Sequence, residues 1–163
     1  MIIEETSLDQ VKIVKNEIFE DERGFFFESF NLKKWQNDGI NYNFVQDNHS
    51  RSKKGVLRGL QLQINKPQGK LVRCIRGNIL DVAVNINRKS PDFAKYFSIE
   101  LSEENKLQLW IPPGFAHGFC VLSDYADFCY KCTDYYDPSD ECGLIWNDPS
   151  IAIDWPIKNP ELS

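Results

Sequence analysis

Two histidines and a scattered set of cations, amides and phenols are the side chains of this sequence that could do chemistry. A metal site in a β-sandwich needs two or three histidines and a carboxylate at one point. His49 and His117 are far apart in the sequence and no HxH pair occurs, so we expect no metal cofactor. No GxSxG segment and no glycine-rich phosphate loop is present, so neither a serine hydrolase nor a phosphate-loop protein is predicted.

Polar residues on strand-like segments are the better candidates for a site. Arg58, Gln61 and Gln63 lie on VLRGLQLQ, and Lys70 opens the next segment. A regular strand puts Arg58 and Gln61 on opposite faces, whereas a bulge at Gly59 changes this parity. Taken alone, an arginine on a strand is more often solvated than functional, so both interpretations of Arg58 stay open.

Further polar and aromatic residues cluster in three other segments. They are Arg23 and Glu28 around three phenylalanines, the run Gln46, Asp47, Asn48 and His49, and the phenols Tyr130, Tyr135 and Tyr136. Cations, amides and aromatic rings together suit an anionic, partly aromatic ligand such as a nucleotide diphosphate. The aromatic residues also fit a core, and His117 in PPGFAHG is typical of a turn.

Length and composition indicate one globular domain over residues 1–163. The chain is 42% hydrophobic and 26% charged, which allows a real core. Its net charge of −5 argues against a nucleic-acid partner. No run of about 18 apolar residues occurs, and the acidic start does not resemble a signal peptide, so no membrane partner is expected.

The five cysteines favour a reducing, cytoplasmic location, because their number is odd and their neighbours are apolar or strand-like. Cys129 and Cys132 form a CxxC pair, which is a weak signal for zinc or redox chemistry. On a strand, positions three apart face opposite sides, so we expect thiols without a metal.

Most segments alternate as short strands separated by turn residues, and this spacing predicts an antiparallel all-β double-sheet jelly roll with a pocket between its sheets. One short helix is expected over 31–39 and the start of another over 159–163. The expected strands are 11–19, 24–30, 42–50, 56–63, 70–77, 78–86, 96–102, 106–112, 118–123 and 126–136.

Six motifs in order resemble the dTDP-4-dehydrorhamnose 3,5-epimerase family over nearly the whole chain. They are DERGFFFESFN (21–31), FVQDNHSRSKKGVLRGLQLQ (44–63), QGKLVRCIRGNILDVAVNI (68–86), ENKLQLWIPPGFAHGF (104–119), YKCTDYYDPSDE (130–141) and WNDPSIAIDWP (146–156). The resemblance implies a homodimeric cupin-type jelly roll without metal or organic cofactor. It also implies inversion of C3 and C5 in a dTDP-linked 4-keto-6-deoxy sugar, on the way to dTDP-L-rhamnose.

The family reaction needs a base for the proton next to the ketone, a donor to the enolate oxygen and an acid on the other face. By motif, Tyr130 is the acid, Lys70 is the donor near the C4 oxygen, and Tyr136 stacks on the thymine. The remaining positions implied to bind the nucleotide sugar are Arg23, Phe26, Glu28, Gln46, Asp47, Asn48, Arg58, Gln63, His117 and Glu141.

Position 61 departs from the family pattern, in which RGLHxQ supplies a histidine base that an aspartate orients. Gln61 stands in the histidine position, and the sequence ends at Ser163, before the segment that carries the aspartate. An amide is no useful base near neutral pH, and loss of a general base typically lowers a rate by about 10²–10⁴-fold.

Several explanations of Gln61 stay open. Glutamine could have been introduced in place of the histidine. The chain could be a natural relative with reduced or different activity, such as an epimerase that inverts one carbon, with Lys70, Tyr130 or Asp81 moving the proton. It could also be a silent protein that binds dTDP-sugars. Asp81 is equally well explained as a structural hydrogen-bond acceptor.

Overall fold

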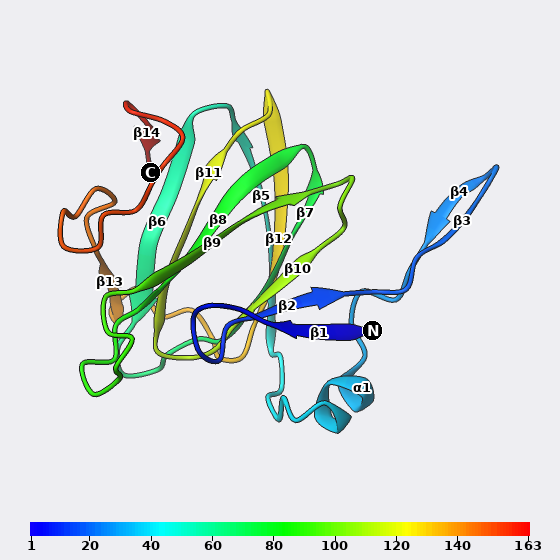
Figure 1. The fold of residues 1–163 in the computed structure, drawn as a ribbon, viewed down its shortest axis with the longest axis horizontal. Coiled ribbons are helices and arrows are strands. Elements are labelled where there is room, and N and C mark those ends of the chain that lie inside the picture. Colours follow the sequence, from blue (N-terminus) through cyan, green and yellow to red (C-terminus); the bar gives the residue numbers. More distant parts are fainter.

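Two six-stranded sheets face each other in the computed structural model, which describes all of residues 1–163 (Figure 1). The first sheet has the order β1 (Ile2–Glu5), β2 (Lys12–Lys15), β10 (Gln108–Ile111), β7 (Lys70–Arg76), β12 (Tyr125–Cys132) and β5 (Gln46–Lys53). The second has the order β13 (Glu141–Gly143), β6 (Val56–Gln63), β11 (Phe115–Val121), β8 (Asn78–Asn85) and β9 (Tyr96–Ser102), with β14 (Glu161–Leu162) also beside β6. The predicted antiparallel double-sheet fold is confirmed.

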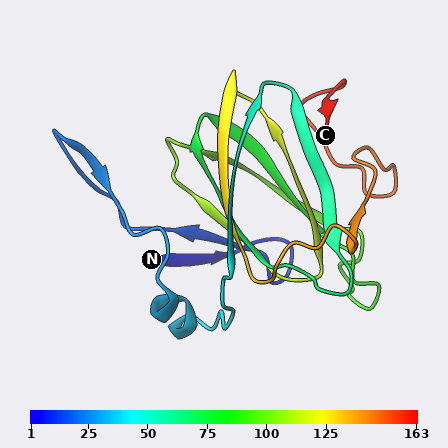
Figure 2. The ribbon, with the colours of Figure 1, turned by 180° about the vertical axis from the view of Figure 1, so that it is seen from behind.

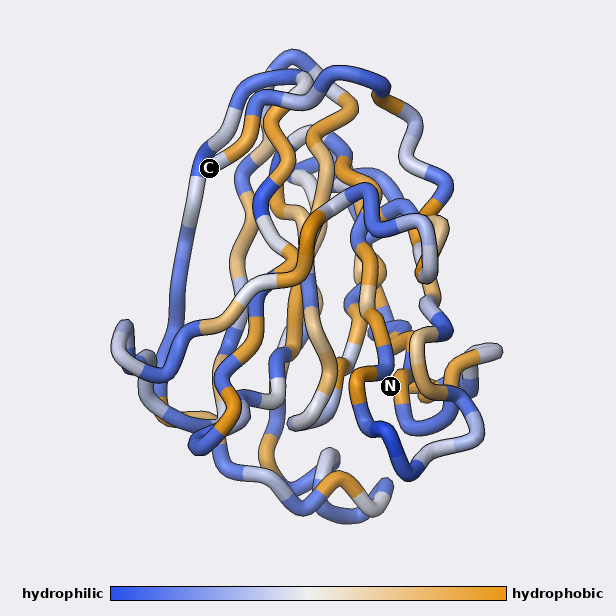
Figure 3. The backbone as a smooth tube through the Cα atoms, turned by 90° about the vertical axis from the view of Figure 1, so that its left-hand side faces the viewer, coloured by the Kyte–Doolittle hydropathy of each residue, from blue (hydrophilic) through white to orange (hydrophobic).

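The main core lies between the two sheets because alternate residues of each strand point inward. Val72 and Phe128 enter it from the first sheet, and Ile79, Ala83 and Phe119 enter it from the second. Figure 3 shows the hydrophobic stretches running along these strands, with hydrophilic loops at their ends. The interior is therefore apolar except where particular strands turn polar side chains inward.

Each outer face has its own cover. The helix α1 (Leu32–Asn37) places Trp35 against Val14 and Trp110 on the first sheet. Its N-terminus is capped by Asn31, whose side-chain oxygen accepts a hydrogen bond from the Lys34 amide, and the chain turns at Gly39, as predicted. The second sheet is covered by the C-terminal segment, which contributes Leu144, Ile151, Ile153 and Trp155.

The hairpin of β3 (Phe19–Asp21) and β4 (Gly24–Phe26) projects from the body of the molecule, as Figures 1 and 2 show from two sides. Phe19, Phe25 and Phe26 are 56%, 58% and 70% exposed. The expected long strands over 11–19 and 24–30 are therefore wrong in extent. Phe25 and Phe27 stack on each other with centroids 6.0 Å apart, but Phe25 does not enter the core.

Two local predictions are wrong. His117 lies within β11 and not in a turn, because the chain turns earlier, at Gly114, and residues 115–121 then alternate inward and outward. Residues 159–163 do not begin a helix, because β14 pairs in parallel with Val56 and Leu57, next to the stretch of β6 that β13 covers. The free hydrogen-bonding edge of β6 thus decides the conformation of this segment.

The two cysteines of the CxxC pair lie on opposite faces of β12, as the sequence predicted. Cys132 is buried on β12, whereas Cys129 opens to the pocket on the outer face of the first sheet, so the two thiols face opposite sides. All five cysteines are free.

The chain contains no helix with the length and apolar character needed to span a membrane.

Candidate active site

A bulge between β6 and β11 sets the orientation of the site residues. His117 pairs with Gln61 and Phe119 pairs with Arg58, so one residue of β11 faces two of β6. Gly118 and Gly59 meet at this point, where a Cβ on Gly59 would lie 2.6 Å from the Gly118 Cα. The bulge reverses the parity of β6, and both Arg58 and Gln61 face inward. The sequence had left these two arrangements open.

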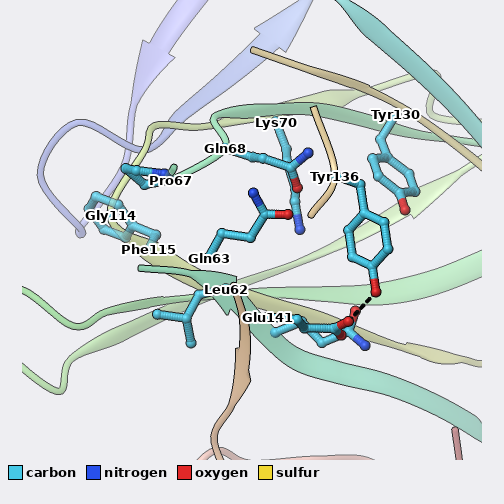
Figure 4. Close-up of a pocket in the computed structure, with 11 residues that line it drawn as sticks. Leu62, Gln63, Pro67, Gln68, Lys70, Gly114, Phe115, Tyr130, Tyr136 and Glu141 are labelled. Carbon is cyan, nitrogen blue, oxygen red and sulfur yellow. Dashed lines mark hydrogen bonds between the residues drawn. The ribbon is translucent and has the colours of Figure 1, made fainter. Parts of the chain in front are cut away.

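The inward polar residues line a hollow between the sheets with two lobes. The deeper lobe has a volume of about 140 Å³ and contains Arg58, Gln61, Lys70, His117 and Tyr130. The outer lobe, of about 60 Å³, shares three of these residues and adds Gln63, Gln68, Tyr136 and Glu141. Figure 4 shows the outer lobe, with Lys70, Gln63 and Gln68 reaching into one space beside Tyr130 and Tyr136.

Two cations in the hollow have no carboxylate partner. Arg58 donates a hydrogen bond to the Ser52 hydroxyl at 3.0 Å, and neither Arg58 nor Lys70 forms an ion pair. The Lys70 ammonium lies 5.8 Å from the centre of the Tyr130 ring. Burial lowers the pKa of Lys70 from its ordinary value. An anionic ligand would give both groups the ion-pair partner that they lack in the protein.

Tyr130 stands in the hollow as a protonated phenol. Its ring packs on Phe128 with centroids 5.4 Å apart, and burial raises the pKa of its hydroxyl above the ordinary value. A phenol held in this state can donate a proton to a carbanion and does not readily accept one at neutral pH.

His117 and Asp81 form a buried pair on the second sheet. The imidazole Nε2 lies 2.9 Å and 3.1 Å from the two carboxylate oxygens. Asp81 is 0% exposed and His117 is 6% exposed. The ring of His117 stacks on Phe128 with centroids 6.0 Å apart, on the same aromatic side chain that supports Tyr130.

Three polar residues around the hollow position the loop that carries Tyr136. The Gln63 side chain donates to the carbonyls of Lys66 and Tyr135 and accepts from the Asp137 amide. Gln46 accepts from the Tyr136 amide at 2.9 Å and donates to Asn48. The Tyr136 hydroxyl donates to Glu141, which raises the pKa of that hydroxyl (Figure 4).

Six residues with an expected binding role do not line the hollow of their own chain. Gln46 and Asn48 lie beside it on β5 and contact it only through the hydrogen bonds described above. Arg23 and Phe26 lie on the projecting hairpin, where Arg23 pairs with Asp21. Glu28 pairs with Lys34 beside α1, and Asp47 pairs with Lys131 on the outer face of the first sheet.

Sequence reasoning did not single out Phe128, Gln68 and Ser50, which also line the hollow. Phe128 had been grouped with an ordinary strand, and only the pairing of β12 with β7 and β5 shows that it faces inward next to Tyr130. Ser50 alternates with Asn48 and Ser52 along β5, a period-two pattern that could have indicated it.

The arrangement suits proton transfer at a carbon next to a carbonyl group. Unpaired cations can hold anionic oxygen, Tyr130 can supply a proton from the first sheet, and polar groups of the second sheet face it across the gap. Gln61 is the residue of β6 that lies opposite His117.

Comparisons with known proteins agree with this geometry. A family model described as dTDP-4-dehydrorhamnose 3,5-epimerase matches residues 5–163. The dTDP-4-dehydrorhamnose 3,5-epimerase of Shigella flexneri is 54% identical over 165 residues, which cover 100% of this chain and 91% of that protein.

Solved structures of epimerases that act on dTDP-linked sugars are also similar to this chain. The dTDP-6-deoxy-D-glucose-3,5-epimerase of Legionella pneumophila Philadelphia 1, in complex with dTDP-4-keto-L-rhamnose, is 53% identical with a TM-score of 0.97, over 99% of this chain and 87% of that one. A 3'-monoepimerase of Streptomyces bikiniensis, in complex with dTDP-quinovose, is 28% identical with a TM-score of 0.90, over 97% and 81% of the two chains.

Proposed function

Since the chain belongs to the dTDP-4-dehydrorhamnose 3,5-epimerase family, we propose that its hollow binds a dTDP-linked 4-keto-6-deoxy sugar and inverts carbons next to the ketone. The observation that carries the proposal is the convergence of Arg58 and Lys70 in one cavity without carboxylate partners. A pyrophosphate and a developing enolate oxygen are the negative groups such a substrate brings.

We propose roles for the side chains from the family motif, and their positions in the hollow support these roles. Lys70 donates a hydrogen bond to the C4 oxygen and stabilises the enolate, while Arg58 holds the pyrophosphate. Tyr130 protonates the carbanion from the side of the first sheet. Tyr136, positioned by Gln46 and Glu141, offers a flat ring for the thymine. Gln63 and Asn48 hold the surrounding loop and strand in place.

A reduced reaction is the second candidate, and Gln61 is the observation that favours it. A neutral amide in the wall of the hollow removes one proton acceptor, so the chain would invert one carbon or would bind the sugar without turnover. One relative of similar structure is named a 3'-monoepimerase, which is a precedent for inversion of a single carbon but not for a glutamine in the wall.

We also propose a homodimer in which the hairpin of one chain completes the hollow of the other. Arg23 and Phe26 have a nucleotide-binding role by motif, yet they project away from their own hollow, and three phenylalanines of the hairpin are exposed. A second copy would bury these rings and bring Arg23 to a phosphate. Light scattering at micromolar concentration should give a dimer, and a monomer would contradict this part of the proposal.

We also propose a cytoplasmic location, because five free thiols suit a reducing compartment. The net charge of −5 gives no reason to expect a nucleic-acid partner, and we propose neither that nor a membrane partner.

Calorimetry and solvent-deuterium exchange test the proposed function together. The chain should bind dTDP, and deuterium should enter C3 or C5 of a dTDP-4-keto-6-deoxy sugar faster than without protein. If dTDP binds but no deuterium exchange occurs, the chain is a protein that binds dTDP-sugars without turnover. The absence of dTDP binding would contradict the proposal altogether.

A further inference from the structure

We propose that His117, held by Asp81, is the group that accepts the substrate proton in this chain, in place of a base at position 61. The inference rests on the proposed function, because it names a residue for the same reaction. It starts from the pairing of β6 and β11, in which His117 is the cross-strand partner of Gln61. An imidazole therefore lies directly beside the position that the amide occupies.

Asp81 has a polar partner only in His117. Its strand neighbours Ile79 and Ala83 and its cross-strand partners Ile99 and Phe119 are all apolar. A fully buried carboxylate in such surroundings needs a donor, and both its oxygens lie within hydrogen-bond distance of the same Nε2. The carboxylate thus fixes the tautomer with hydrogen on Nε2 and stabilises the imidazolium that forms when the ring takes a second proton.

The other ring nitrogen, Nδ1, remains free to accept a proton. It forms no hydrogen bond in the protein, and it is not among the buried side-chain atoms without a partner, which are those of Asn16 and Trp35. His117 lines the deeper lobe of the hollow, so this nitrogen keeps access to the space where a sugar would lie.

The other groups that face His117 are less suited to the task. The guanidinium of Arg58 from β6 donates hydrogen bonds and has no acceptor atom. Lys70 from β7 must keep its proton to serve the C4 oxygen, and the buried phenol of Tyr130 from β12 is an acid. Asp81 from β8 is itself fully buried and lies behind the imidazole.

The proton balance of the step is simple. Nδ1 takes the proton from the carbon next to the ketone, and the C–H electron pair becomes the C=C bond of an enolate whose charge rests on the C4 oxygen. Tyr130 then gives its hydroxyl proton to the other face of that carbon. Imidazolium and phenolate return to their neutral forms by exchange with water. The two groups come from opposite sheets, as inversion requires.

The test measures deuterium incorporation into a dTDP-4-keto-6-deoxy sugar by His117→Gln and, as a matched control, His49→Gln. His49 is the only other histidine, and its side chain is 56% exposed on the outer face of β5. His117→Gln should lower exchange by about 10²–10⁴-fold while dTDP still binds. His49→Gln should leave the rate unchanged.

The same His117→Gln substitution in a chain that also carries Gln61→His distinguishes a proton-transfer role of His117 from a purely structural one. With Gln61→His in place, a second base is present, and His117→Gln should lower exchange far less than it does in the unaltered chain. Equal losses in both backgrounds, or full exchange in His117→Gln, would overturn the inference. If His117→Gln does not fold because Asp81 loses its partner, the double change Asp81→Asn and His117→Gln removes that buried charge and allows the same comparison.

Two outcomes keep this inference apart from the proposed function. Exchange that does not depend on His117 in a chain that binds dTDP overturns the inference alone. A chain that does not bind dTDP overturns the proposed function as well. Imidazole added to His117→Gly should restore part of the exchange, which a purely structural role would not predict.

Discussion

Arg58 and Gln61 are separated by only two residues on β6, yet both side chains face the hollow, which a regular strand would not allow. The bulge opposite Gly118 causes this change of parity. It permits Arg58 to reach Ser52 on the opposite sheet while Gln61 stays beside His117. The position of both residues in the site therefore depends on the close contact of Gly59 and Gly118.

Gly59→Ala should destabilise the fold and abolish ligand binding. Gly59 has φ +110°, and an added Cβ would lie 2.6 Å from the Gly118 Cα and from the His117 carbonyl oxygen. We expect a loss of about 2–5 kcal/mol in the free energy of unfolding, measured by urea denaturation. Gly39→Ala is the control, because Gly39 has φ +83° and open space around it. Equal losses in both variants would contradict the role of the glycine contact.

Lys70→Met should raise stability and lower activity. The ammonium has no ion-pair partner, and burial lowers its pKa, so folding disfavours its charge. Since the unfolded chain binds this proton more tightly, the charge weakens the native state at neutral pH. We expect a higher Tm and exchange about 10²–10³-fold slower, because the donor to the enolate is lost. Lys89→Met, on an exposed loop, should change neither. A lower Tm in Lys70→Met would contradict this view of Lys70.

Tyr130→Phe should leave deuterium incorporation into the sugar largely intact but should slow the inversion of its carbon. The phenyl ring keeps the packing on Phe128, but the acid on the first sheet is lost. The base can still take a proton and return deuterium to the same face, so incorporation should continue. Inversion, followed by NMR of the sugar, should fall by about 10²–10⁴-fold. Tyr125→Phe, at the exposed start of β12, is the control. If incorporation stops together with inversion, Tyr130 is itself needed for proton removal.

Mixing two defective chains should restore activity if the hairpin serves the partner. Phe26→Ala damages only the hairpin, and Arg58→Ala damages only the hollow. In a mixed dimer, the hollow of the first variant would receive an intact hairpin from the second, so one of the two sites in each mixed dimer would work. No recovery after unfolding and refolding the mixture together would show that the hairpin acts within its own chain.

Much of the fold could be predicted from the sequence, because period-two alternation marks strands that are covered on one side. The strands 56–63 and 96–102 match their predicted ranges, and α1 lies within the predicted 31–39. The hairpin and β14 could not be predicted in the same way. Their conformations depend on an exposed aromatic face and on a free edge of β6, which arise only once the sheets have formed.

Arg58, Lys70, His117 and Tyr130, which the sequence analysis singled out, line one lobe of the hollow, while their roles stay predictions. The orientation of Arg58 could not be derived, because the bulge depends on the approach of two glycines from different strands. The pairing of Asp81 with His117 was also out of reach, since no local pattern links positions on β8 and β11.

The most direct test of the account is solvent-deuterium exchange by the unaltered chain on a dTDP-4-keto-6-deoxy sugar, with Gln61 in place. The central claim is that this hollow still removes a proton next to the ketone. The account predicts incorporation at C3 or C5 above the rate without protein, and its loss in His117→Gln. Tight binding of the sugar nucleotide with incorporation at the background rate, even at high protein concentration, would contradict it.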